Sequence, residues 1–191
     1  MQIRYVLAPL VCLGLIAQGA SNVQPARPSP EFTIHLTPSG QFSPTDYKGK
    51  VVVLACILTT CPHCQAAVGM LSGLQREYGP QGLQVLAVAF NPMANMLVPD
   101  FIKQFHPNFP VGWAEQIDVY NYVNHSTMTP LYSPSFIFID RKGMIRYQRL
   151  GDDPLMLTDQ EKNTRAAIEE LLKEPASKKA PAAAAGKKKT T

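Results

Sequence analysis

The sequence predicts an α/β fold in which a central mixed sheet is flanked by helices on both faces. Two short apolar runs, 51–57 and 83–90, enclose a segment of helical periodicity, as in two parallel strands joined by a crossover helix. Later, the runs 136–139 and 144–149 surround the turn sequence Asp-Arg-Lys-Gly and predict an antiparallel hairpin. Parallel and antiparallel pairs together favour a mixed sheet, and the helices between and after them supply its covering layers.

The segments before the first long strand are short and rich in turn residues. Residues 21–30 contain three prolines and predict a linker. Residues 32–36 alternate apolar and polar side chains and predict a first, edge strand. Residues 38–50 form a turn-rich approach to the strand 51–57.

The remaining elements follow from periodicity and helix-end residues. The helix after the strand 51–57 has an inward face and ends at Gly79 and Pro80. Further helical segments are expected at 99–105 and 117–123, and the sequence Thr-Asp-Gln-Glu at 158–161 predicts a capping box that opens a last helix. The inward face of the first helix consists of Ala67, Leu71, Leu74 and Tyr78.

The composition changes along the chain and divides it into four parts. Residues 1–20 predict a signal peptide, because Arg4 precedes an apolar run and Ala-Gln-Gly offers a cleavage site; an uncleaved membrane anchor is the alternative. Residues 21–30 are the linker, 31–174 a single folded domain, and 175–191 a disordered tail rich in Ala, Pro and Lys. A signal peptide implies a periplasmic or otherwise extracytoplasmic location, where disulfides persist.

The net charge of +4 is concentrated in the tail, which holds five lysines and no acidic residue. Subtracting these five charges from +4 leaves −1 for the rest of the chain. A nearly neutral folded region argues against nucleic-acid binding. The Lys-rich tail could make weak contact with an anionic membrane or cell-wall polymer, and an inert, solvated tail is the alternative.

The motif Cys61-Pro62-His63-Cys64 directly follows the strand 51–57. Pro62 suits the first helical position, so Cys61 is expected at the N-cap and Cys64 one turn into the helix. The positive end of the helix dipole stabilises a thiolate, which is the form that attacks disulfides. His63, when protonated, would add positive charge beside Cys61. Strand, Cys-x-x-Cys and helix in this order predict a redox-active dithiol.

The remaining cysteines do not complete a metal or haem site. A zinc site needs two further Cys or His ligands at close spacing, and Cys12 and Cys56 form no second pair. A c-type haem site requires His directly after the second Cys, where Gln65 stands. No metal ligand and no cofactor is therefore assigned. Cys56 is expected to be a small buried hydrophobe, with a third redox thiol as the alternative.

Four sequence features give the chain a resemblance to a known family. They are Tyr-Lys-Gly-Lys at 47–50, the Cys-x-x-Cys motif, Asn-Phe-Pro-Val at 108–111, and the segment 134–140 followed by Arg-Lys-Gly. Through them the chain resembles the thioredoxin-like thiol–disulfide oxidoreductases of the TlpA/ResA type, in the redoxin (AhpC/TSA) superfamily. The resemblance implies a thioredoxin fold for 31–174 and an extracytoplasmic enzyme. That enzyme would exchange a Cys61–Cys64 disulfide with protein thiols and disulfides and with a membrane or periplasmic redox donor.

The resemblance also implies roles for residues outside the motif. Pro134 matches a cis-proline that faces the active-site disulfide, and the backbone of Ser133 would then pair with a bound peptide substrate. Pro130 is a competing candidate, but it lies too far upstream of the strand 136–139.

Three positions depart from the family pattern. Thr60 stands where an aromatic residue usually precedes the first cysteine. Ala55 and Ala67 stand where buried acidic residues would move protons to and from Cys64. Proton transfer in this chain must then use water, His63 or a more distant group.

The direction of the exchange stays open. The Pro-His dipeptide between the cysteines resembles that of oxidising DsbA-type proteins, whereas the rest of the chain resembles a reductase family. Two other functions are weaker alternatives. A thiol peroxidase of the redoxin superfamily would need Pro and Thr or Ser where Leu54 and Leu58 stand. A copper-binding chaperone on the same fold would use soft thiolate ligands, but usually at a wider spacing.

Overall fold

The structure, a computed structural model, describes residues 25–175. The predicted signal peptide (1–20) lies outside the described residues. The predicted tail (175–191) also lies outside them, except for Pro175. The strands are β1 Arg27–Pro28, β2 Ile34–His35, β3 Gln41–Phe42, β4 Val51–Ile57, β5 Leu83–Ala89, β6 Val111–Trp113, β7 Ser135–Ile139 and β8 Met144–Arg149. The α-helices are α1 Pro62–Tyr78, α2 Ala94–Phe105, α3 Gln116–Tyr122, α4 Pro154–Leu157 and α5 Gln160–Lys173; 3-10 turns cover Pro44–Tyr47 and Gly79–Gln81.

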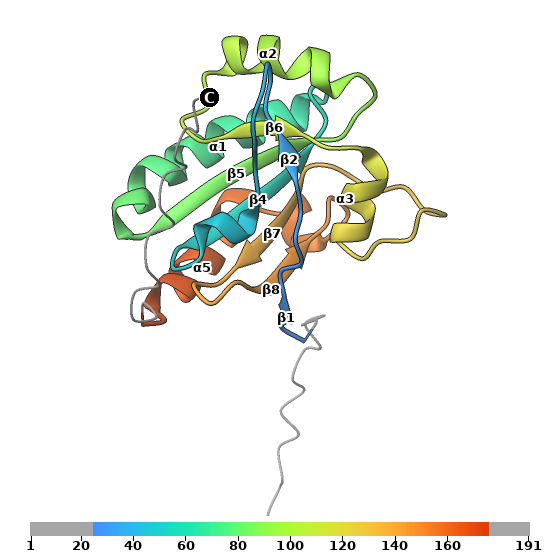
Figure 1. Cartoon of the computed structure of the whole chain (residues 1–191). Coiled ribbons are helices and arrows are strands. Elements are labelled where there is room, and N and C mark those ends of the chain that lie inside the picture. The colour runs from blue at the N-terminus through green and yellow to red at the C-terminus, as the bar shows by residue number, and fades with distance from the viewer. Residues whose placement is uncertain (1–24, 176–191) are drawn as a thin grey trace, which may run out of the picture.

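The strands of the described region form one mixed sheet in the order β1-β8-β7-β4-β5-β6-β2-β3 (Figure 1). Strands β4, β5 and β6 are parallel, and β7 lies antiparallel on the other side of β4. Every residue of β4 is buried, because neighbours flank it on both sides and layers cover both faces. The predicted thioredoxin-like α/β architecture is confirmed.

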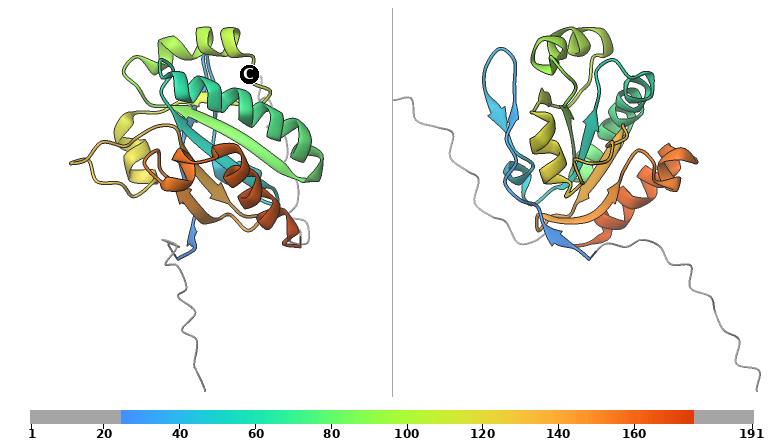
Figure 2. Two further views of the ribbon diagram at one scale, coloured as in Figure 1. Left: turned by 180° about the vertical axis from the view of Figure 1, so that it is seen from behind. Right: turned by 90° about the vertical axis from the view of Figure 1, so that its right-hand side faces the viewer.

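Side chains alternate along β4 between two cores. Val51, Val53, Ala55 and Ile57 pack with α1, α2 and α5, whereas Val52, Leu54 and Cys56 pack with α3 and the N-terminal segment. Figure 2 shows α1 and α5 on one face of the sheet and α3 with the N-terminal segment on the other. The predicted inward face of α1 is buried throughout.

The N-terminal predictions need correction. The range 21–30 was expected to be a linker, but Arg27–Pro28 forms β1 against β8. The expected edge strand at 32–36 is β2, which pairs with both β6 and β3, so β3 lies at the edge. Strands β1 and β3 are each only two residues long, too short for an apolar period to be recognised. β1 also depends on a strand far along the chain, β8, whereas β3 pairs with the nearby β2.

The predicted helix at 99–105 begins earlier, at Ala94, and contains Pro99 in its interior. Pro99 has no backbone N–H to donate to the carbonyl of Asn95. The hydroxyl of Thr37 donates to that carbonyl instead, at 3.3 Å. A side chain from a distant loop therefore compensates for the proline, and the helix continues through it.

The predicted capping box at 158–161 is wrong. Thr158 ends the short helix α4, and its hydroxyl donates to the carbonyl of Pro154 at 2.8 Å. The N-cap of α5 is Asp159 in a left-handed conformation, and its side chain makes no capping bond. The threonine is unavailable as a cap because α4, which the sequence patterns did not predict, already uses it.

Within residues 25–175, none of the helices combines the length and the apolar composition needed to span a bilayer.

Candidate active site

The two cysteines of the motif lie at the start of the helix α1, which follows the central strand β4. Figure 1 shows these two elements. Strand β4 ends at Ile57, and Cys61 is the N-cap of α1 with Pro62 in the first turn, as predicted. Cys61 has an extended backbone and its side chain makes no capping bond. Its sulfur is therefore available for other chemistry at the positive end of a 17-residue helix.

The two thiols differ in exposure. Cys61 is partly exposed and lies beside the exposed Pro62 and His63, whereas Cys64 is fully buried against the core. Both are free thiols, so the structure represents the reduced form. An outside molecule can reach Cys61, while Cys64 can react only with a group already attached there.

The surroundings of Cys64 favour its neutral form. Burial raises the pKa of the Cys64 thiol to about 12, and the neighbouring side chain of Cys61 adds to the shift. The backbone N–H of Leu58 donates to Cys64 Sγ at 3.4 Å and acts in the opposite direction, by favouring the thiolate. Desolvation outweighs this single hydrogen bond, so Cys64 stays protonated at neutral pH.

The positions that lack an acid are both deep in the core. Ala55 and Ala67 are 0% and 1% exposed, on β4 and α1. No carboxylate is among the groups that perturb the pKa of Cys64. The departures from the family pattern thus leave an apolar environment behind the dithiol.

A hydrogen-bond network that the sequence patterns did not predict holds the loop before Cys61. Asn91 Oδ1 accepts from the backbone N–H of Thr59 at 2.9 Å and from its hydroxyl at 3.3 Å. Gln65 Nε2 donates to the Thr59 carbonyl at 3.0 Å. The buried Thr59 is thereby held by Asn91, which follows β5, and by Gln65 of α1. The only sequence signal was the Asn-Pro pair that ends the strand 83–90.

The peptide bond between Ser133 and Pro134 is cis, as the resemblance implied. Cys56 of β4 lies opposite Ser135 of β7 in an antiparallel register, so Ser133–Pro134 lies at the edge of the sheet where β4 runs into the motif. Structure and chain order thus bring the predicted substrate-binding pair to the same end of the fold as Cys61. A second cis bond, Thr37–Pro38, had not been predicted.

Cys56 is fully buried and faces away from the dithiol. It packs in the core on the α3 side of the sheet, whereas Cys64 packs on the α1 side. Burial raises the pKa of the Cys56 thiol to about 12. This placement supports the packing role rather than the role of a third redox thiol.

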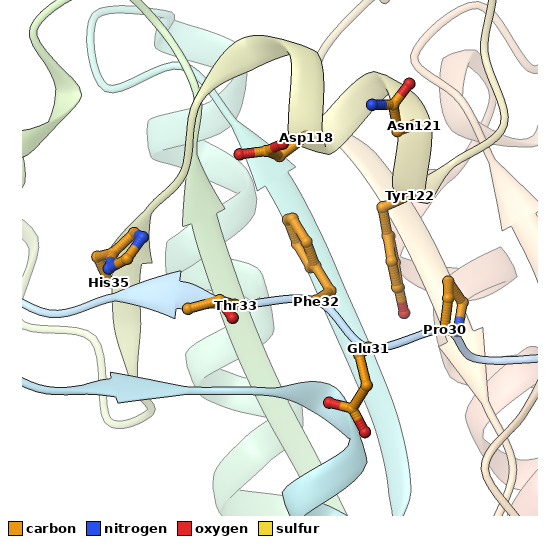
Figure 3. Close-up of a pocket in the computed structure, with 8 residues that line it drawn as sticks. All are labelled: Pro30, Glu31, Phe32, Thr33, His35, Asp118, Asn121 and Tyr122. Carbon is orange, nitrogen blue, oxygen red and sulfur yellow. The ribbon is translucent and has the colours of Figure 1, made fainter.

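A pocket of about 350 Å³ lies apart from the motif, between the segment 30–35 and α3. Figure 3 shows the rings of Phe32 and Tyr122 side by side in it, with the carboxylates of Glu31 and Asp118 on opposite sides. Cys56, Cys61 and Cys64, the cysteines that the structure describes, do not line this pocket. Among residues 25–175, no cluster of three or more His, Cys, Asp or Glu side chains could hold a metal ion.

A mixed sheet between helical layers, a Cys-x-x-Cys pair at a helix N-terminus and a cis-proline at the same sheet edge define a thioredoxin-fold protein with a redox-type dithiol. The family model for Redoxin matches residues 24–168, and the chain belongs to this family.

Individual relatives are distant. The chain is 29% identical over 119 residues to the thiol-disulfide oxidoreductase ResA of Geobacillus thermodenitrificans, covering 62% of this chain and 64% of ResA. It is 26% identical over 112 residues to Protein DipZ of Mycobacterium bovis, covering 59% of this chain but 16% of DipZ. The chain therefore spans less than two thirds of these relatives. A structure named as the thiol:disulfide interchange protein DsbE of Chlorobium tepidum superimposes with a TM-score of 0.62 at 21% identity, over 76% of this chain and 99% of that one.

Proposed function

We propose that the protein is a thiol–disulfide oxidoreductase that exchanges a Cys61–Cys64 disulfide with protein substrates. The observation that carries this proposal is the asymmetry of the pair, with Cys61 partly exposed at the helix N-cap and Cys64 buried behind it. An exchange enzyme needs one sulfur that substrates reach and a second that only the attached substrate meets.

In the reducing direction, the Cys61 thiolate attacks one sulfur of a substrate disulfide. A mixed disulfide forms, and the other substrate sulfur leaves as a thiolate that takes up a proton. Cys64 then loses its proton and attacks Cys61 Sγ, so that the Cys61–Cys64 bond forms and the first substrate sulfur leaves as a thiol. Two electrons pass from the protein to the substrate, and the oxidising direction is the exact reverse.

The neighbouring residues have supporting roles in this proposal. Pro62 begins the helix whose positive end lies at Cys61, and His63 is an exposed neighbour within the motif. Both are proposed to assist the attack by Cys61 Sγ. The backbone of Ser133, next to the cis Pro134, would pair with an extended substrate segment. The redox partner that regenerates the dithiol is proposed to be periplasmic or membrane-bound, in keeping with an extracytoplasmic location.

An insulin-reduction assay tests the activity. With dithiothreitol as electron donor, the wild-type protein should accelerate precipitation of the insulin B chain. Cys61→Ser should abolish the effect. Cys64→Ser, mixed with insulin in the absence of dithiothreitol, should accumulate a mixed disulfide that gel mobility detects. Cys56→Ala serves as the matched control and should retain activity. Equal rates for wild type and Cys61→Ser would overturn the proposal, and peroxide consumption by Cys64→Ser would point to a peroxidase.

The midpoint potential of the dithiol decides the direction. A value near −270 mV, as in thioredoxin, would indicate a reductase, whereas about −120 mV, as in DsbA, would indicate an oxidase.

A further inference from the structure

Two residues outside the motif fix the chain just before the cis-proline. The hydroxyl of Ser135 donates to the carbonyl of Tyr132 at 2.7 Å and accepts from the backbone N–H of Gly151 at 3.0 Å. The Gly151 N–H also approaches the same Tyr132 carbonyl, at 3.2 Å. Ser135 is 0% exposed, so its hydroxyl is fully committed to this bridge.

Gly151 lies in direct contact with the backbone that precedes the cis bond. A Cβ atom at this position would lie 2.5 Å from the carbonyl carbon of Tyr132 and 2.7 Å from the nitrogen of Ser133. These are backbone atoms, which cannot move aside as a flexible side chain would. Glycine is therefore required here for space, and any side chain at residue 151 must displace the loop.

The same loop is anchored once more upstream. The backbone N–H of Leu131 donates to the hydroxyl of Tyr120 at 2.9 Å in a buried environment. Ser133 itself differs from its anchored neighbours. Within residues 25–175, its backbone N–H and carbonyl have no backbone partner, and its buried hydroxyl has none either. The loop thus presents an unpaired N–H and an unpaired carbonyl, both of Ser133, between fixed points.

We propose that Ser135 and Gly151 are positioning residues that hold the Ser133 backbone ready to pair with an extended segment of a protein substrate. This inference rests on the proposed exchange function. A residue whose N–H and carbonyl are unpaired and held in place can bind a strand without the entropic cost of ordering the loop first. Small disulfides offer no strand to pair, so their reaction at Cys61 does not depend on these residues.

The test compares two substrates in the full-length protein. For Gly151→Ala and Ser135→Ala, the KM for insulin should rise roughly three- to tenfold, the effect of losing one or two hydrogen bonds. The rate with the small aromatic disulfide 5,5′-dithiobis(2-nitrobenzoate) and the midpoint potential should stay at wild-type values. A purely structural role would change both substrates together.

Matched controls separate local from general effects. Gly112→Ala introduces a comparable clash, 2.4 Å from the carbonyl oxygen of His35, away from the cis-proline loop. Ser72→Ala removes a buried hydroxyl that has no partner. Neither control should raise the KM for insulin. If Gly151→Ala does not fold, Ser135→Ala tests the positioning role by itself. That variant keeps the hydrogen bond from the Gly151 N–H to the Tyr132 carbonyl, so the loop retains one of its attachments.

The outcomes distinguish this inference from the proposed function. Wild-type kinetics with insulin in both variants, or equal losses with both substrates, would overturn the positioning role while leaving the exchange activity intact. A wild-type protein that reacts with neither substrate through Cys61 would overturn both.

Discussion

The two sulfurs of the motif have opposite environments although they lie three residues apart. Cys61 is reachable from outside, and Cys64 is enclosed by apolar groups with one backbone donor, the N–H of Leu58. Ala55 and Ala67 stand at the two positions where the resemblance implied a buried acid that would accept the Cys64 proton, and both are buried. The deprotonation of Cys64 is therefore expected to limit the second step of the exchange.

This limit predicts a steep pH dependence. Because burial, the largest cause of the raised pKa of Cys64, persists when Cys61 is held in a mixed disulfide, the thiolate fraction and the resolution rate should rise about tenfold per pH unit between pH 7 and 9. Stopped-flow measurement of mixed-disulfide decay, formed on Cys61 with a small aromatic thiol, gives this rate. A plateau starting near pH 8 would contradict the prediction, because it would reveal another group that accepts the proton.

The raised pKa of Cys56 predicts that the folded protein loses stability as the pH becomes alkaline. Its pKa is raised from 9.0 to about 12 in the folded protein, so the unfolded chain releases this proton first as the pH rises. The stabilisation is complete below pH 9 and is lost progressively up to pH 12, by about 1.4 kcal/mol per pH unit. Urea unfolding of the reduced protein at pH 8 and 10.5 should show a smaller decline for Cys56→Ala than for wild type. Parallel declines would contradict the prediction.

At the scale of elements, the motif depends on contacts between segments distant in sequence. The loop 58–60 joins β4 to α1, and Asn91 at the end of β5 supplies the acceptor for both the N–H and the hydroxyl of Thr59. This loop also carries the Leu58 N–H that contacts Cys64. A residue that follows β5 thereby fixes the loop that follows the neighbouring strand β4.

Replacing Asn91 by Ala should loosen this loop. The buried Thr59 would lose its acceptor, at a cost of about 1–3 kcal/mol. Amide hydrogen exchange should then be faster at Leu58 and Thr59 than in wild type, by a factor of about ten or more. The control Asn108→Ala removes a single hydrogen bond to the Ser72 carbonyl and should leave exchange in the loop unchanged. Unchanged protection at Thr59 in Asn91→Ala would contradict this role.

At the scale of the whole molecule, residues 27–29 attach the N-terminal segment to α3 and β8, on the face of the sheet that α3 covers. Arg27 donates to the Tyr122 carbonyl at 2.8 Å and to Gln148 Oε1 at 2.5 Å, and Ser29 Oγ lies 2.9 Å from the Tyr122 hydroxyl. Strand β1 adds backbone pairing with β8. The predicted domain start at residue 31 excludes all of these contacts.

A chain that begins at residue 31 should consequently be less stable than one that begins at residue 25, by about 1–3 kcal/mol. Urea denaturation of both chains measures the difference. Reactivity of Cys61 with a small disulfide should be the same in both, because β1 is an edge strand that β8 and β7 separate from β4. Equal stabilities would show that the segment 25–30 contributes nothing to the fold.

Long strands and the redox motif were predictable because their patterns are local. The run 51–57 matches β4 residue for residue, and Pro62 placed the start of α1 correctly. The strands β1 and β3, the early start of α2 and the misplaced capping box were not predictable in the same way. β1 and the helix that contains Pro99 depend on partners far along the chain, β8 and Thr37 respectively. β3 is only two residues long, and Thr158 is already used by the short neighbouring helix α4.

The sequence by itself determined the α/β class, the central strand and the Cys61-Pro62-His63-Cys64 motif at a helix start, because apolar period, proline and cysteine spacing act over a few residues. Only the tertiary structure decided that Cys64 is buried while Cys61 is accessible, and that Cys56 lies on the opposite face of the sheet. It also decided that Ser135 and Gly151 hold the cis-proline loop. Burial and hydrogen bonding between distant segments arise only when the chain is packed, and they control thiol reactivity.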